Sequence, residues 1–120
     1  MICLSIAYKA TAMTPQQAQQ LVHFLEQAKT RPGLFFPLDE SGLHGFLAGI
    51  YTAQLAFFGP FSRASITDDI LRERGWSVPN ALGPWPEMKA HGYDFSGILD
   101  EILTIEIETL HRTYALSRAS

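Results

Sequence analysis

Arg-Pro-Gly-Leu-Phe at 31–35 is followed by Leu-His-Gly-Phe-Leu-Ala-Gly-Ile-Tyr at 43–51. The proline and glycine of the first stretch interrupt regular structure. The second stretch places apolar residues on nearly every side of a helix, which is typical of a buried element. We therefore expect a central, buried helix from about Glu40 or Ser41 to Phe58, ended by Gly59-Pro60.

Gly45 and Gly49 stand one turn apart in this predicted helix. Glycine inside a helix costs about 1 kcal/mol relative to alanine. Two glycines on one face therefore indicate that another backbone approaches closely there. The spacing is best known from membrane helices, and here it predicts ordinary close helix packing.

The first helix has the clearest start signal. Thr14 is an N-cap residue, Pro15 occupies the first helical position, and Gln17 completes a capping box. Its apolar stripe consists of Ala18, Leu21, Val22, Phe24, Leu25 and Ala28. Pro32-Gly33 ends the helix.

Shorter elements are predicted in the second half of the chain. Ser65 caps a third helix that ends at Gly75, where Trp76 makes the hydrophobic contact of a Schellman motif. A connector rich in proline and aromatic residues follows over 76–85, and 86–91 forms one further turn.

The last helix begins after Asp94 or Ser96 and runs to about Tyr114. Its apolar arc is broad, and its polar side is formed by Asp100, Glu101, Thr104, Glu108, His111 and Arg112. Three substantial helices and one or two short ones predict a single all-α, bundle-like domain over 1–120. Within residues 1–8, large apolar residues alternate with small ones, and this pattern allows a short strand. The alternative is a loosely ordered lead-in over 1–12.

Composition excludes several classes of function. The 120 residues carry a net charge of −3, and the nine Lys and Arg do not cluster, so we expect no binding to nucleic acid or anionic membranes. The lone Cys3 excludes an intrachain disulfide and is typical of the reducing cytoplasm. No apolar run reaches the roughly 20 residues of a membrane span. The expected location is the cytoplasm.

Two partial resemblances to known families are present. The stretches 31–35 and 43–51 resemble the "RPGMY" motif and following helix of small bacterial proteins, some of which are similar to immunity proteins of contact-dependent toxin systems. Leu34-Phe35 stands where Met-Tyr is usual, and Ile50 replaces a Tyr. Residues 43–47 also resemble the "LHGFL" segment of the YecA/YgfB family of helical proteins. The first resemblance implies an immunity- or inhibitor-like role, and neither implies a catalytic residue.

Glu106 is the most unusual residue of the last helix, because helical spacing places it in the middle of the apolar arc. A buried carboxylate must be protonated, hydrogen-bonded or paired. We expect a partner on the central helix, most plausibly His44 or Tyr51. A carboxylate beside an imidazole can perform acid–base chemistry, so these three residues are the only catalytic candidates. The alternatives are a structural buried pair and a Glu106 that is exposed or lies at an interface.

No metal or cofactor is predicted. Glu108 and His111 have the Glu-x-x-His spacing of di-iron bundles, but a second such motif is missing. His23 and Glu26 form a similar pair in the reverse order, and both pairs fall on polar faces. The sequence contains none of the glycine-rich nucleotide-binding motifs.

The region from Phe57 to Tyr93, which includes the connector, is the predicted contact surface for another protein. The candidates are Phe61, Trp76, Trp85 and Tyr93, because rigid aromatic groups are favoured at the centres of interfaces. The alternatives are a lid over the core and a small-ligand pocket beneath that lid. We therefore expect a non-enzymatic bacterial protein-binding module, with a homodimer as a further expectation.

Overall fold

The computed structural model describes residues 13–58, 64–77 and 84–116, without the side chains of 54–58 and 64–65. These residues form an all-α fold without strands. The α-helices are α2 (Pro15–Thr30), α3 (Glu40–Phe58), α4 (Ala64–Glu73), α5 (Trp85–Ala90) and α6 (Phe95–Tyr114), and a 3-10 turn, η1, spans Pro32–Leu34. The predicted fold class is thereby confirmed. The alternation at 1–8 and the lead-in over 1–12 lie outside the described residues.

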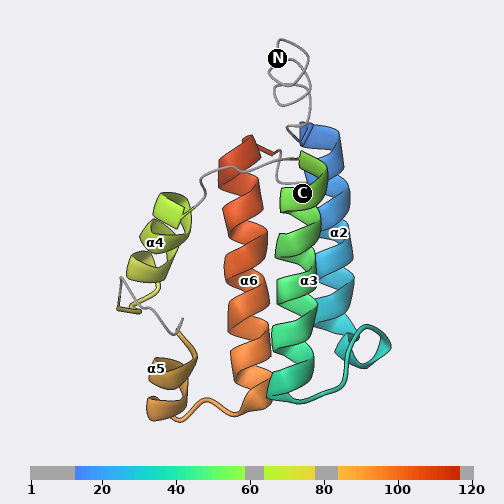
Figure 1. The fold of residues 1–120 in the computed structure, drawn as a ribbon. Coiled ribbons are helices and arrows are strands. Elements are labelled where there is room, and N and C mark those ends of the chain that lie inside the picture. The colour runs from blue at the N-terminus through green and yellow to red at the C-terminus, as the bar shows by residue number, and fades with distance from the viewer. Residues whose placement is uncertain (1–12, 59–63, 78–83, 117–120) are drawn as a thin grey trace.

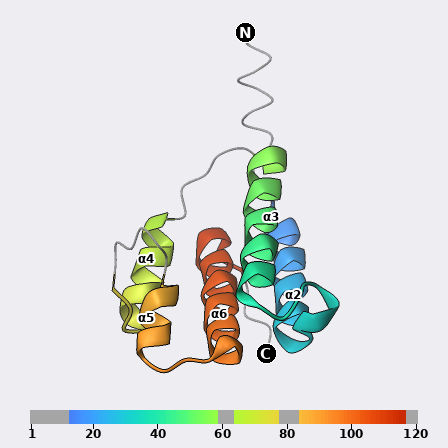
Figure 2. The ribbon, with the colours of Figure 1, turned by 60° about the horizontal axis from the view of Figure 1, so that its bottom comes forward.

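Helices α2, α3 and α6 lie side by side, and α4 and α5 lie on the far side of α6 (Figures 1 and 2). Chain direction reverses between α2 and α3, and α6 runs the same way as α3. The largest fully buried side chains come from all five helices: Val22, Leu25, Leu43, Ile70, Met88, Ile98, Leu103, Thr109 and Leu110. Helix α6 packs against both α2 and α4, so it is the central element of the fold.

The predicted capping signals of α2 and α6 are confirmed. The Gln17 N–H donates to Thr14 Oγ1 (3.1 Å), and the Thr14 N–H donates to Gln17 Oε1 (2.9 Å), which completes the capping box. Asp94 caps α6 by accepting the Gly97 N–H at 2.8 Å. Short polar side chains before each helix thus fix where it begins.

Helix α4 ends in the predicted Schellman motif. The Trp76 N–H donates to the Leu71 carbonyl (2.8 Å) and the Gly75 N–H to the Arg72 carbonyl (3.0 Å). Gly75 has a φ of +90°, a conformation that glycine adopts at no steric cost. The start of α4 differs from the prediction, since the helix begins at Ala64 and contains Ser65.

Helix α3 is not buried on most of its circumference, and that prediction was wrong. Only Leu43 and Leu47 are buried among the side chains described for it. Its exposed positions are Ser41, His44, Gly45, Ala48, Gly49, Tyr51, Thr52 and Ala53. Apart from the backbone of α3 itself, no atom of the described residues lies within 4 Å of where a Cβ would sit on Gly45 or Gly49, so these residues do not make the expected close backbone approach.

The α4–α5 arm (64–77 and 84–90) is held to α6 by a buried carboxylate. Glu101 accepts two hydrogen bonds from the Arg74 guanidinium (2.6 and 2.7 Å) and one from Trp76 Nε1 (2.8 Å). Sequence periodicity had placed Glu101 on the solvent side, and its burial corrects that assignment. Among the described helices, none is long and apolar enough to cross a bilayer.

Candidate functional site

Tyr51 on α3 and Glu106 on α6 form a pair. Tyr51 is one of the two partners that the sequence predicted for Glu106, the other being His44. The Tyr51 hydroxyl donates a hydrogen bond to Glu106 Oε1. Glu106 is 7% exposed, so its carboxylate is buried as well as bonded. A carboxyl group buried between two helices requires a hydrogen-bond partner, so this pair is suited to anchoring α3 to α6.

His44 does not take part in this pair. It lies about 10 Å of helix rise before Tyr51, is exposed, and stacks on Trp85 with ring centroids 4.1 Å apart. No hydrogen bond or ion pair joins it to Glu106. The three catalytic candidates are therefore divided between two places, and no acid–base pair of an imidazole and a carboxylate is formed by them.

The four predicted contact residues have different positions. Phe61 lies outside the described residues. Trp76 and Trp85 are buried, and Tyr93 is partly exposed with its ring 5.4 Å from that of Trp76. The indole N–H of Trp76 is already bonded to Glu101. Both tryptophans therefore cover the core, as the lid alternative requires, and they do not form an outer surface.

The carboxylate of Glu101 is strongly stabilised in its charged form. Hydrogen bonds from Arg74 lower its pKa most, and the Trp76 N–H and the positive charges of Arg74 and Lys29 lower it further, while burial acts in the opposite direction. The same pair raises the pKa of Arg74. This ion pair is therefore structural, and we assign it no chemistry beyond anchoring the arm.

The large apolar side chains with the highest exposure lie at or beside the connection between α2 and α3. Leu34 is 75% exposed, Leu38 is 60% exposed and Phe24 is 41% exposed. Together with the partly buried rings of Phe35 and Phe46 they form a surface that we call the aromatic patch. Leu38 lies over the first turn of this connection, with its Cδ1 only 3.8 Å from the Cβ position of Gly33.

The rings of the aromatic patch are packed against one another. Phe24 meets Phe35 edge to face at 5.1 Å and stacks on Phe46 at 5.8 Å. The ring of Phe36, which is buried, packs against the ring of Phe46 with centroids 4.7 Å apart. Aromatic pairs of this kind add roughly 0.5–1.5 kcal/mol beyond area burial. The patch is thus rigid on its inner side and exposed on its outer side.

Two hollows border the patch and share Phe35. The first has a volume of about 420 Å³ and is lined by His23, Glu26, Gln27, Thr30, Arg31, Leu34 and Phe35. The second has a volume of about 450 Å³ and is lined by Phe35, Phe36, Pro37, Asp39, Ser41, Gly42, Gly45 and Phe46. The second hollow extends the patch onto the outer face of α3.

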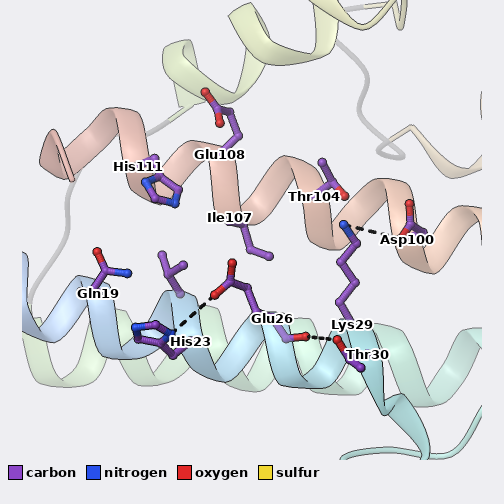
Figure 3. Close-up of a pocket in the computed structure, with 11 residues that line it drawn as sticks. Gln19, His23, Glu26, Lys29, Thr30, Asp100, Thr104, Ile107, Glu108 and His111 are labelled. Carbon is purple, nitrogen blue, oxygen red and sulfur yellow. Dashed lines mark hydrogen bonds and ion pairs between the residues drawn. The ribbon is translucent and has the colours of Figure 1, made fainter. Parts of the chain in front are cut away.

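A third and larger hollow, of about 690 Å³, lies between α2 and α6 (Figure 3). It brings together the two His/Glu pairs considered in the sequence, for which no metal was predicted: His23 with Glu26 and Glu108 with His111. Within the described part of the chain, however, no three His, Cys, Asp or Glu residues are grouped so that they could hold a metal ion. Glu108 instead accepts a hydrogen bond from Arg112 at 2.8 Å.

The aromatic patch was missed by sequence reasoning, although a signal for it existed. Residues 34–38 read Leu-Phe-Phe-Pro-Leu in a connection only a few residues long. A connection this short, lying at the surface, can bury only some of five consecutive apolar side chains. The two leucines at its ends and Pro37 are the ones left exposed. Comparison with known proteins adds no further evidence, since no family model, curated protein or solved structure matches the chain.

Proposed function

We propose that this chain is a non-enzymatic protein-binding module of the cytoplasm and that the aromatic patch is its contact surface. The observation that supports this most directly is the exposure of Leu34 and Leu38 beside packed aromatic rings. Exposed leucines grouped in this way are costly in water and mark interaction sites in monomeric proteins. The partner's apolar side chains would cover them on binding.

The shape and chemistry of the patch fit this role. Interface centres are enriched in aromatic groups, and energetically important contacts cluster where such groups are held in place before binding. The rings of Phe24, Phe35 and Phe46 are fixed by one another, so little side-chain entropy is lost on binding. The hollows on both sides of Phe35 offer room for side chains of the partner.

An immunity- or inhibitor-like role is one form that such binding would take, and it rests on the resemblance of 31–35 and 43–51 alone. The rival function, a small enzyme or ligand-binding protein using His44 and Glu106, is disfavoured. A buried Glu106 bonded to Tyr51 offers a substrate no access, and His44 is engaged with Trp85.

The test is capture of partners from the native cells with the full chain and with a Leu34→Ser/Leu38→Ser variant. Both leucines are exposed, so the variant is expected to fold with nearly unchanged stability. A stoichiometric partner bound by wild type and lost with the variant would support the proposal. The matched control is Tyr93→Ser, which removes a large exposed side chain whose ring contacts Trp76 and lies outside the aromatic patch. A partner retained by the leucine variant, or no stoichiometric partner at all, would contradict it.

A homodimer through the outer face of α3 is the second form of the proposal. Between Glu40 and Phe58 this helix contains no Asp, Lys or Arg, and its outer stripe of Ser41, Gly45, Ala48, Gly49 and Thr52 is exposed. Small side chains allow two helices to approach closely. Light scattering during size-exclusion chromatography checks this: we expect a dimer that Gly49→Gln converts to a monomer. A monomer at all concentrations would exclude it.

A further inference from the structure

The hollow of about 420 Å³ beside the aromatic patch combines apolar walls with one positive charge that has no partner. Leu34 and Phe35 form its apolar side, and Arg31 lies next to them in the same turn, because the Leu34 N–H donates to the Arg31 carbonyl at 3.1 Å. Among the described residues, the Arg31 guanidinium has neither an ion pair nor a hydrogen bond. Its backbone N–H is used, since it donates to the Gln27 carbonyl at 2.8 Å.

The other charged groups around the patch are already engaged. Glu26 Oε1 lies 3.6 Å from His23 Nδ1. Asp39 Oδ1 accepts the Gly42 N–H at 2.7 Å at the start of α3, and Glu40 pairs with Lys89. The charge that this surface offers to a binding partner is therefore the guanidinium of Arg31.

We infer that the partner of the aromatic patch is a polypeptide segment in which an Asp or Glu side chain adjoins a leucine or an aromatic residue. The apolar residue would enter the hollow against Leu34 and Phe35, and the carboxylate would pair with Arg31. This inference rests on the proposed binding function and adds the chemistry of the partner. The planar guanidinium suits carboxylates because it can form two parallel hydrogen bonds.

Glu26 sets the direction of approach, because its carboxylate lines the same hollow and repels another. The partner's acidic group is therefore expected on the Leu34 side of Arg31, away from Glu26. Removing the negative charge with Glu26→Gln should tighten binding, while Arg31→Gln should weaken it. The two substitutions thus have opposite predicted signs within one hollow.

A random peptide library displayed on phage tests the inference with the full-length chain. Wild type should enrich peptides that combine leucine or aromatic residues with Asp or Glu. Arg31→Glu should enrich Lys or Arg in place of the acidic residue. The matched control is Arg72→Glu, which changes the net charge equally on the exposed side of α4 and should select the same peptides as wild type.

Direct titration with the most enriched peptide supplies the magnitude. Arg31→Gln removes the exposed ion pair between Arg31 and the peptide, and its loss should increase the Kd about two- to fivefold. Added salt should weaken binding to wild type more than to this variant. Circular dichroism should show both Arg31 variants folded, because only the backbone of Arg31 takes part in ending α2.

The outcomes separate the two proposals. Apolar peptides that lack an acidic residue but depend on Leu34 and Leu38 would overturn the charge inference and leave the binding surface standing. Acidic preference that persists with Arg31→Glu would also overturn the inference. Peptides that bind the Leu34→Ser/Leu38→Ser variant equally well, or no enrichment with wild type, would overturn both.

Discussion

The Tyr51 hydroxyl on α3 donates a hydrogen bond to the buried carboxyl group of Glu106 on α6. Loss of this bond should destabilise the fold, because removing one partner of a hydrogen bond to a buried polar group costs about 1–3 kcal/mol. We expect Tyr51→Phe to lower the free energy of unfolding by that amount in urea denaturation. Glu106→Gln retains an acceptor for the hydroxyl and should cost less. Equal stability of Tyr51→Phe and wild type would show that the pair is not an anchor.

The ion pair of Arg74 and Glu101 should contribute to the attachment of the α4–α5 arm, beside the bidentate pair of Arg112 on α6 with Glu73 on α4. Glu101→Gln removes the charge that Arg74 and Trp76 both bind, so we expect a loss of about 2–4 kcal/mol. The control is Asp100→Asn, next to it in sequence, whose carboxylate is exposed and 3.6 Å from Lys29. That substitution should change stability by less than about 1 kcal/mol. Chemical denaturation of both variants gives the comparison.

The same carboxylate predicts how stability depends on pH. The folded-state pKa of Glu101 is lowered, first by the hydrogen bonds from Arg74, so its contribution is fully present above the unfolded value of about 4.3. As the pH falls through the lowered folded-state pKa, this contribution is lost. The stability difference between wild type and Glu101→Gln should therefore be constant from pH 7 to about 5 and shrink at lower pH. A difference that stays constant down to pH 2 would contradict the assignment.

The glycines near the start of α3 should respond to substitution in opposite ways. A Cβ on Gly42 would lie 2.1 Å from the Pro37 carbonyl oxygen, so Gly42→Ala must displace backbone and should cost about 1–3 kcal/mol. Within the single chain, Gly45 and Gly49 have open space around them, so alanine there should raise the stability of the monomer by roughly 0.5–1 kcal/mol each. Thermal unfolding of the three variants tests this. A destabilising Gly49→Ala would indicate a neighbour not accounted for.

Local signals in the sequence predicted the helices well because their causes are local. Thr14 and Gln17 form their capping box within one turn, and Gly75-Trp76 ends α4 through bonds to Leu71 and Arg72. Such contacts depend only on residues a few positions apart. The start of α2 and the end of α4 therefore followed from spacing alone, whereas the start of α4 did not.

The wrong predictions concerned which face of a helix packs against its neighbours. Helix α3 is apolar all round, and periodicity in such a helix does not indicate which side meets α2 and α6. Glu101 lies at the edge of the apolar arc of α6, and its burial depends on Arg74 and Trp76, more than 20 residues away in sequence. The position of His44 against Trp85 is similarly non-local.

Part of the candidate site could be derived and part could not. Glu106 was expected to need a partner because burying an unpaired charge is costly, and Tyr51 was one of two residues at suitable positions. The contact surface was expected on Trp76 and Trp85, because large aromatic residues are common both at interfaces and in cores. Only the packing of α4 and α5 on α6 decides between these two environments for the tryptophans.

The chain has only two tryptophans, and both belong to the α4–α5 arm. Trp76 donates to a carboxylate and Trp85 faces an imidazole, so each indole has a distinct and removable neighbour. Intrinsic fluorescence therefore reports on release of the arm from α6, while far-ultraviolet circular dichroism follows all the helices. If the arm detaches before the rest unfolds, the two signals will have different midpoints, and this protein can reveal a partly open state without any attached label.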